Sequence, residues 1–386
     1  MENELGKNKK SRRTYGFDEI ALCPSIITVN PEDCNTAVTI AGIKLEIPII
    51  ASAMDSCISP QTAALMSKYG GLGVLNLQGI QTRYDNVGKI YDQIASVSKD
   101  EYVVLMQKLY EEPVKNELIK KRIREIKDAG GVAAVSSIPQ QAEELAPIAK
   151  DAGVDIFVIQ STVISTRHKS VRSKPLDLAK FTKNIGLPVV VGNCATYDVA
   201  LELMSQGIAA LMVGIGPGAA CTSRGVLGIG VPMATCIADC AAARDVYYKE
   251  TGKYIPIIGD GGMAVGGDIC KAIACGADAV MVGSPIAKCA EAPGKGYHWG
   301  MATPNATLPR GSRIKVGTVG TLKEILLGPA RYDDGSMNFI GALKTSMGTL
   351  GASNIKEMQQ VEVIIAPSIL TEGKVYQKAQ ALGMYK

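Results

Sequence analysis

One cysteine of this chain stands in a polar, glycine-rich stretch. In GIGPGAACTSRG, residues 214–225, glycines occupy positions 214, 216, 218 and 225, and Thr222, Ser223 and Arg224 directly follow Cys221. Glycine permits positive φ and lets backbone groups come close to a ligand or an ion. Nearby N–H dipoles or a cation favour the thiolate, the nucleophilic form of cysteine. The pattern predicts a nucleophile at Cys221, and a structural cysteine in a glycine-rich turn is the alternative.

A second group of residues suits a phosphorylated ribose. The segments PIIGDGG (256–262) and AVMVGSP (279–285) place glycine amides and the Ser284 hydroxyl after two apolar runs. Backbone N–H groups at such positions commonly bind phosphate in barrel enzymes. Asp260 would repel a phosphate, but its carboxylate can accept hydrogen bonds from a ribose diol. We therefore expect a ribose monophosphate ligand, although barrels that bind flavin mononucleotide carry a comparable phosphate site.

The elements that must position these residues are short apolar runs separated by helical patterns. The runs are continuous rather than alternating, as expected for parallel strands that are covered on both faces. Such a β-α alternation predicts an α/β fold, a closed (β/α)8 TIM barrel, with a doubly wound open sheet as the alternative. The eight expected strands are 47–53, 71–77, 132–138, 155–161, 188–193, 210–216, 256–262 and 279–285.

Polar or small residues stand at the carboxyl end of nearly every one of these strands. In a closed barrel the carboxyl ends of the strands meet at one rim, where the active site lies. Each residue alone could be an ordinary turn former. Together they predict a ligand site at this rim, and they include Ser52, Asn76, Gln160, Asn193 and Asp260.

Two stretches exceed what a regular barrel needs. About 55 residues separate the second and third strands, where residues 98–130 predict extra helix, and about 100 residues follow the eighth strand. Long insertions in barrels commonly form lids or oligomer contacts. We expect one catalytic domain over residues 1–386, with a basic flexible tail at 1–14 and a flap and extension at about 290–350.

Composition excludes several function classes. Hydrophobic residues make up 47% of the 386 residues and charged ones 20%, and the net charge is +4. A nucleic-acid binder would more often show a broad basic patch interleaved with aromatic residues. Neither a secretion signal nor an apolar run of roughly 18 residues is present, so we expect a cytoplasmic protein without a membrane span. The ten cysteines show no metal-type pairs and are expected to be reduced thiols.

Several motifs together resemble one enzyme family. GIGPGAACTSRGVLGIGVP, PIIGDGGM, VMVGSP and ASAMD are similar to segments of the inosine monophosphate dehydrogenase and guanosine monophosphate reductase family, over residues 15 to about 375. The resemblance is closest to the dehydrogenase-related subfamily that lacks paired CBS domains. It implies NAD-dependent oxidation of inosine 5′-monophosphate to xanthosine 5′-monophosphate, in guanine nucleotide biosynthesis. The alternatives are an NADPH-dependent guanosine monophosphate reductase and a non-enzymatic purine-nucleotide-binding barrel.

The resemblance also implies roles for individual residues. The catalytic group would be Cys221, which attacks carbon 2 of the base, with Ser223 and the flap residue Arg310. The substrate group would be Ser52, Met54, Asn193, Gly218, Asp260, Gly261, Gly262, Gly283, Ser284, Tyr297, Gly300 and Met301. The NAD group would be Gln160, Ser161, Thr162, Gly214 and Gly216. The ligands of a potassium ion would be Gly216, Gly218, Cys221 and, from a neighbouring subunit, Glu372 and Gly373.

The chain departs from the family pattern at a few positions. Gly311 replaces the tyrosine that accompanies the flap arginine in dehydrogenases, and the reductases' glutamate is also missing. Gln160 replaces an aspartate near the nicotinamide nucleotide, and Met212 replaces an arginine before the cysteine loop. His298 is expected to line the flap. The resemblance further implies a homotetramer with cyclic four-fold symmetry, or an octamer of two such rings, without control through CBS domains.

Overall fold

Eight short strands of mainly apolar residues close into a parallel barrel. The computed structural model describes residues 2–171, 174–366, 376 and 379–380. The barrel strands pair in chain order, and the last of them pairs with the first, which closes the sheet. All eight predicted strands are confirmed, and the open-sheet alternative is wrong. They are β6 (Ile49–Ala51), β7 (Leu72–Asn76), β8 (Ala134–Ser137), β9 (Ile156–Gln160), β10 (Val189–Cys194), β11 (Ala210–Val213), β12 (Ile257–Asp260) and β13 (Ala279–Val282).

Alternate residues of each strand serve two different cores. In β10, Val190 points into the barrel interior, whereas Val189 and Val191 pack outward. β12 repeats the pattern, with Ile258 inside and Ile257 outside. Because both faces are buried, continuous apolar runs are what such strands require.

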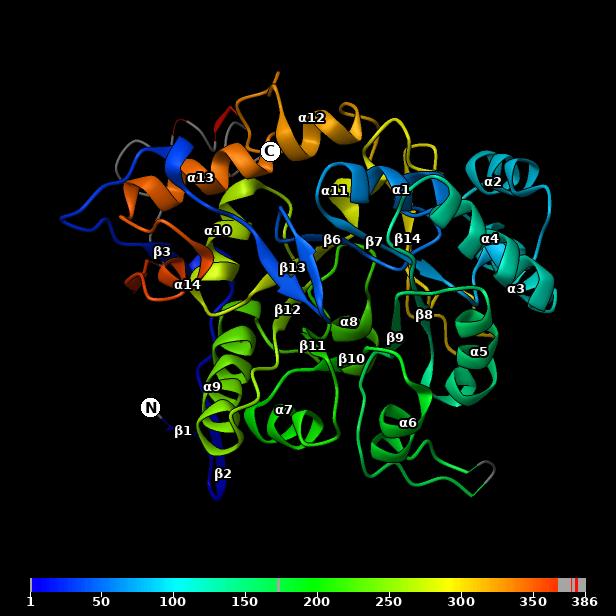
Figure 1. The fold of residues 1–386 in the computed structure, drawn as a ribbon, viewed down its shortest axis with the longest axis horizontal. Coiled ribbons are helices and arrows are strands. Elements are labelled where there is room, and N and C mark those ends of the chain that lie inside the picture. Colours follow the sequence, from blue (N-terminus) through cyan, green and yellow to red (C-terminus); the bar gives the residue numbers. More distant parts are fainter. Residues whose placement is uncertain (1, 172–173, 367–375, 377–378, 381–386) are drawn as a thin grey trace.

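Helices cover the outside of the barrel (Figure 1). α1 begins after Ser59, whose side chain accepts the Thr62 N–H, and Pro60 occupies its first turn. α6 and α9 end at glycines in the left-handed conformation, Gly186 and Gly252. These outer helices are α1 (Pro60–Lys68), α4 (Asn116–Asp128), α5 (Pro139–Asp151), α6 (Leu178–Ile185), α7 (Tyr197–Met204), α9 (Met233–Thr251), α10 (Gly266–Ala274), α11 (Ser284–Ala287), α12 (Leu322–Leu327) and α13 (Phe339–Thr349).

A small hairpin closes the amino-terminal end of the barrel. Ile40 of β4 (Val38–Ile40) and Leu45 of β5 (Ile43–Leu45) join the same core as the inward-facing strand residues. β3 (Ile20–Leu22) pairs antiparallel with β16 (Val363–Ile365), so two segments that are more than 300 residues apart in the chain lie side by side. The remaining short elements are the single-turn helices η1 (Phe17–Glu19), η2 (Pro31–Asp33) and η3 (Ile80–Thr82).

The basic amino-terminal segment is a hairpin, not a flexible tail. β1 (Glu2–Gly6) pairs with β2 (Lys9–Arg12) around Asn8, which adopts a positive φ. Arg12 forms an ion pair with Asp239 of α9. The expectation failed because the charge run masked a turn in which asparagine tolerates the left-handed conformation.

The long connection after β7 contains extra helix, partly within the predicted range 98–130 and partly before it, at residues 87–96. α2 (Val87–Ser96) and α3 (Tyr102–Glu111) precede α4 and will be called the inserted helices. They share a separate hydrophobic core with a third hairpin, formed by β14 (Tyr297–Trp299) and β15 (Arg313–Lys315). The rings of Tyr91 and Trp299, with centroids 6.2 Å apart, join the two parts. The insertion is therefore packed against the segment that follows the barrel.

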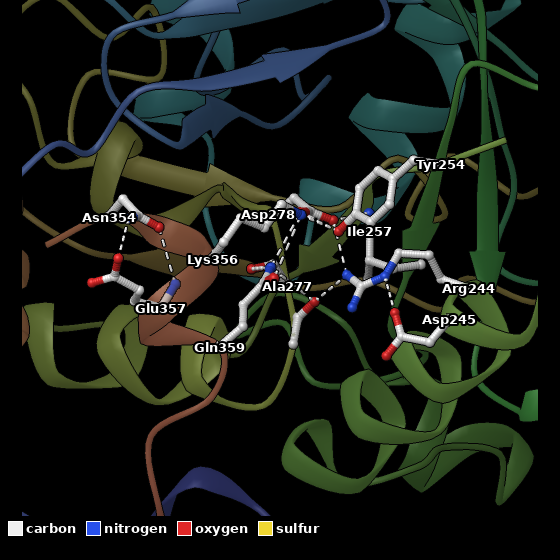
Figure 2. Close-up of polar contacts among 11 residues, drawn as sticks. Arg244, Asp245, Tyr254, Ile257, Ala277, Asp278, Asn354, Lys356, Glu357 and Gln359 are labelled. Carbon is white, nitrogen blue, oxygen red and sulfur yellow. Dashed lines mark hydrogen bonds and ion pairs between the residues drawn. The ribbon is translucent and has the colours of Figure 1, made fainter. Parts of the chain in front are cut away.

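A buried carboxylate ties the carboxyl-terminal segment to the amino-terminal end of the barrel (Figure 2). Asp278, just before β13, accepts hydrogen bonds from Arg244 at 3.1 Å, Tyr254 at 2.7 Å and Gln359 at 3.1 Å, and it also contacts Lys356 of α14 (Ile355–Met358). Burial opposes its ionisation, but Arg244, Lys356 and these hydrogen bonds together hold its pKa below the ordinary value. In (β/α)8 barrels, residues at the amino-terminal end commonly stabilise the fold, whereas catalysis occurs at the opposite end.

Two expectations about composition can be compared with the described chain. All ten cysteines are free thiols; seven are buried, whereas Cys23, Cys221 and Cys275 are partly exposed. Among the residues that the structure describes, no helix combines the length and the apolarity needed to cross a membrane.

Candidate active site

The cysteine loop connects β11 to the short helix α8 (Ser223–Leu227). The Cys221 N–H donates to the Gly218 carbonyl at 3.0 Å, which forms a tight turn. The Cys221 thiol lies 3.3 Å from the Ser223 hydroxyl, to which it donates, and its side chain is partly exposed. Arg224 packs where a Gly216 side chain would stand, and it donates to the Val231 carbonyl at 3.0 Å. The loop thus holds an accessible thiol in a fixed turn.

A flap, residues 300–312 between β14 and β15, pairs with this loop. Gly311 opposes Cys221 in an antiparallel bridge. On either side, the Ser312 N–H donates to the Ala220 carbonyl at 3.0 Å and the Thr222 N–H to the Arg310 carbonyl at 3.4 Å. The predicted nucleophile and the predicted flap arginine therefore lie on adjacent backbone segments.

The Arg310 side chain reaches the rim beyond β9. Its Nη1 donates to the Thr162 hydroxyl at 3.4 Å. Thr162 follows Ser161, whose backbone exchanges hydrogen bonds of 2.9 and 3.0 Å with Gly192 and Asn193. The structure thus brings the flap arginine to the loop where the cofactor residues were predicted.

Packing explains why no tyrosine follows Arg310. A Cβ at Gly311 would stand 2.4 Å from the Thr303 hydroxyl and 3.2 Å from the Thr303 nitrogen. Any larger side chain would have to displace this part of the flap. In this arrangement Arg310 is the flap's ionisable side chain nearest the cysteine loop.

Asp260 forms a polar cluster with two amides at the strand ends. Asn193 Nδ2 and Gln160 Nε2 both donate to its Oδ2, at 2.8 and 3.1 Å, and Asn193 Nδ2 also donates to the Gly214 carbonyl at 2.9 Å. Burial raises the pKa of Asp260 to about 6, although the two amide hydrogen bonds oppose this rise. Both amide donors converge on one oxygen, which leaves Oδ1 for a ligand.

The expected phosphate end lies beside Asp260, after β12 and β13. Gly261 and Gly262 both have positive φ, and the Gly261 N–H donates to the Met281 carbonyl at 3.0 Å. Ser52 donates its N–H to the Val282 carbonyl at 3.0 Å, which brings the end of β6 alongside. Gly283 is flanked by Met54 and His298: a Cβ there would lie 3.2 Å from the Met54 sulfur and 3.3 Å from His298 Nε2.

His298, rather than Tyr297, faces this group of residues. The Tyr297 ring stacks under Arg313, whose guanidinium carbon lies 4.6 Å from its centroid. Successive residues of a strand point to opposite sides, so His298 points the other way. It is buried, its Nδ1 lies 2.9 Å from the Ser56 hydroxyl, and burial lowers its pKa to about 4. It is therefore a neutral imidazole at neutral pH. The sequence predicts it only at the flap, but it lies beside the expected phosphate end.

The other residues singled out in the sequence lie either at the rim or in tightly packed positions. The sulfur of Met301 accepts a hydrogen bond from Asn76 at 3.3 Å, and Gly300 lies next to the Ala220 carbonyl, so both are at the rim. Gly214 is tightly packed, because a Cβ there would meet the Asp260 carbonyl at 2.4 Å. Met212 is fully buried in the barrel interior.

A family profile described as the IMP dehydrogenase / GMP reductase domain matches residues 14–376. The chain belongs to this family. It is thus a member of an oxidoreductase family, in agreement with the motifs of the cysteine loop and the strand ends.

Relatives within the family differ in how far their activity is known. An uncharacterized oxidoreductase of Mycolicibacterium smegmatis is 39% identical over 371 residues, which cover 94% of this chain and 99% of the relative. An inosine-5′-monophosphate dehydrogenase of Methanocaldococcus jannaschii is 29% identical, with 94% and 95% covered. The crystal structure of an IMP dehydrogenase/GMP reductase-like protein from Corynebacterium glutamicum superposes with a TM-score of 0.90 at 36% identity, with 94% and 97% covered.

The potassium ligands expected from a neighbouring subunit lie in another part of the chain. Glu372 and Gly373 lie outside the described residues. Within the part of the chain that the structure describes, no cluster of three or more histidine, cysteine or acidic side chains could hold a metal ion. A potassium ion bound by backbone carbonyls would not depend on such a cluster.

Proposed function

We propose that this protein oxidises inosine 5′-monophosphate to xanthosine 5′-monophosphate with NAD as the hydride acceptor. The observation that carries the proposal is the pairing of the Cys221 loop with the flap at Gly311, which places a partly exposed thiol next to the Arg310 segment. The Asp260 cluster on the neighbouring strand ends supports a ribonucleotide as the substrate.

In the proposed reaction, Cys221 loses its proton to solvent and the thiolate attacks carbon 2 of the hypoxanthine. The Ser223 hydroxyl, 3.3 Å away, can reverse its role and donate to the thiolate. Carbon 2 then expels its hydrogen as hydride, and the purine stays bound to sulfur as a thioimidate. NAD, when bound, supplies the acceptor for that hydride. Water next attacks carbon 2, the C–S bond breaks, and the product leaves with the thiol restored.

Residues at the rim suit the two nucleotides. The free Oδ1 of Asp260 would accept from the ribose diol, and the glycine amides at 262 and 283 with Ser284 would hold the phosphate, with Gly261 shaping the turn. The amide of Gln160 and the hydroxyls of Ser161 and Thr162 are uncharged and fit a dinucleotide, which they would hold beside Arg310.

Arg310 would serve the hydrolytic half of the reaction. Its guanidinium stays charged in proteins and stabilises hydroxide as it develops on the attacking water. We also propose that a potassium ion orders the loop through the carbonyls of Gly216, Gly218 and Cys221, completed by Glu372 and Gly373 of a neighbour in a tetramer or octamer.

The test is an absorbance assay of nicotinamide reduction with inosine monophosphate, NAD and potassium. Cys221→Ala should reduce turnover by several orders of magnitude while nucleotide binding persists. Cys275→Ala is the matched control. It removes a partly exposed thiol at the carboxyl-terminal end of α10 and should leave turnover unchanged. Turnover by Cys221→Ala at the parent rate would contradict the covalent mechanism.

Two further measurements separate the alternatives. Release of ammonia from guanosine monophosphate with NADPH, without activity on inosine monophosphate, would assign the reductase activity instead. Arg310→Ala should keep the initial burst of hydride transfer and slow hydrolysis, so that the adduct on Cys221 accumulates and is detected by intact-protein mass spectrometry. Loss of the burst itself would show that Arg310 acts in binding.

A further inference from the structure

Arg313, the first residue of β15, reaches into the inserted helices. Its Nη1 donates to the Ile94 carbonyl and its Nη2 to the Val97 carbonyl at 2.8 Å, and these carbonyls lie at the carboxyl-terminal end of α2. A guanidinium here satisfies carbonyls that have no partner within the helix, and its charge interacts favourably with the helix dipole. One side chain thus joins the β14–β15 hairpin to α2.

Two aromatic rings enclose the same guanidinium. Its central carbon lies 4.8 Å from the ring centroid of Tyr102, in α3, and 4.6 Å from that of Tyr297, in β14. Cation–π contacts of this kind are stronger where water is excluded, and Tyr102 is 4% exposed. Arg313 is therefore bound by α2, α3 and β14 together.

Other contacts between the inserted helices and the hairpin are weaker. Lys295 and Asp92 form an ion pair whose side chains are 49% and 67% exposed, and such pairs contribute little. Gln107 donates to the Asn305 carbonyl at 3.3 Å on the exposed side of the flap. Arg313 is thus the main polar connection, beside the apolar contact of Trp299.

The position of Arg313 in the chain connects these contacts to the cysteine loop. Arg313 follows Ser312, whose N–H donates to the Ala220 carbonyl, and Gly311, which opposes Cys221. A shift of the Arg313 backbone would therefore be transmitted within two residues to the segment that pairs with the Cys221 backbone.

We propose that Arg313 is a positioning residue through which the inserted helices hold the flap segment 310–312 against the Cys221 loop. The insertion is then a support for the flap rather than a separate module. The proposal rests on the proposed function only in taking Cys221 as the reacting group, and its test needs no turnover.

The test measures how fast iodoacetamide alkylates individual thiols in the full chain, by peptide mass spectrometry. Arg313→Gln should accelerate alkylation of Cys221 about tenfold, because loss of charged hydrogen bonds makes local opening of the flap more frequent. Cys23 and Cys275, the other partly exposed thiols, are internal references and should react at parent rates. Lys315→Gln, an exposed position on the same strand, is the matched control and should change none of them.

A second variant guards against misfolding. Arg313→Lys keeps the positive charge between the rings but cannot bond both carbonyls as a fork, so a smaller acceleration at Cys221 is expected. An unchanged Cys221 rate in Arg313→Gln would overturn the proposal, and so would equal acceleration at all three thiols, which would show general destabilisation. If Cys221 alone accelerates but inosine monophosphate is not oxidised, the positioning role stands and the proposed function fails.

Discussion

Replacing Asp260 with asparagine should stabilise the ligand-free protein and weaken its nucleotide complex. Burial raises the pKa of this carboxyl from the ordinary 3.8 to about 6, so keeping it ionised at neutral pH costs folding free energy. Asparagine has nearly the same shape, and its oxygen can still accept from Asn193 and Gln160. The variant therefore removes the charge and keeps the cluster.

The size and pH range of the effect follow from the pKa. A rise of roughly two units corresponds to up to about 3 kcal/mol of unfolding free energy at pH 7. Because the folded pKa lies above the unfolded one, the cost is full above pH 6, shrinks as the pH falls, and vanishes below about 4. The stabilisation of Asp260→Asn should therefore be greatest at pH 7–8 and absent near pH 4.

Binding should change in the opposite direction. A carboxylate that accepts from a ribose diol forms charged hydrogen bonds worth about 1.5–3 kcal/mol, so inosine monophosphate should bind about 10- to 150-fold more weakly to the variant. A 2′,3′-dideoxy analogue should bind equally to both proteins, because it offers no hydroxyl to lose.

Urea denaturation at pH 8 and pH 4 and calorimetric titration measure the two effects. Asp85→Asn, at a side chain that is 73% exposed, is the matched control and should change neither. The reasoning is refuted if Asp260→Asn is no more stable than the parent at pH 8, or if the parent binds the ribo and dideoxy nucleotides with equal affinity.

Three further results are expected. Asp278→Ala should destabilise the fold by about 3–5 kcal/mol in urea denaturation, since it removes the buried partner of Arg244 and leaves only the exposed Asp245, whereas Asp245→Asn should cost under about 1 kcal/mol. Tyr110→Phe should lower the free energy of unfolding more at pH 8 than at pH 5. It removes a hydrogen-bond donor to buried Asp55, whose pKa burial raises to about 6, and the ionised carboxylate present at pH 8 depends most on that donor. Equal losses at both pH values would contradict this. By NMR, His298 should protonate only near pH 4, and inosine monophosphate but not inosine should raise its pKa. The exposed His168 is the reference, and its signal should not respond to either ligand.

Periodicity was sufficient to predict the barrel and its rim. Strands buried on both faces must be continuously apolar, and their order in a closed barrel is their order in the chain. Asn193, Gln160 and Asp260 lie at the carboxyl ends of different strands, yet they meet because parallel strands bring these ends to one edge. The glycine-rich loop predicted Cys221 as the nucleophile, and the family resemblance added the flap residue Arg310.

What the sequence could not show depends on register and on distant partners. β14 has three residues, too few for a pattern to tell that His298 rather than Tyr297 faces Gly283. The contacts of Asp278 with Arg244 and Lys356 span 34 and 78 residues, and no local signal marks such pairs. The amino-terminal hairpin was missed for a different reason, because its lysines and arginines are typical of a solvated tail.

The pairing of β3 with β16 has a consequence for the order in which the protein is made. Residues 20–22 leave the ribosome early, but their partner strand, 363–365, is synthesised more than 300 residues later. Lys356 and Gln359, which bind Asp278, are equally late. A nascent chain can therefore assemble its central strands first, but it cannot complete the amino-terminal end of the barrel until residues 356–365 have left the ribosome. Contacts so far apart in sequence are slow to form, so this end should be the last to acquire its native structure.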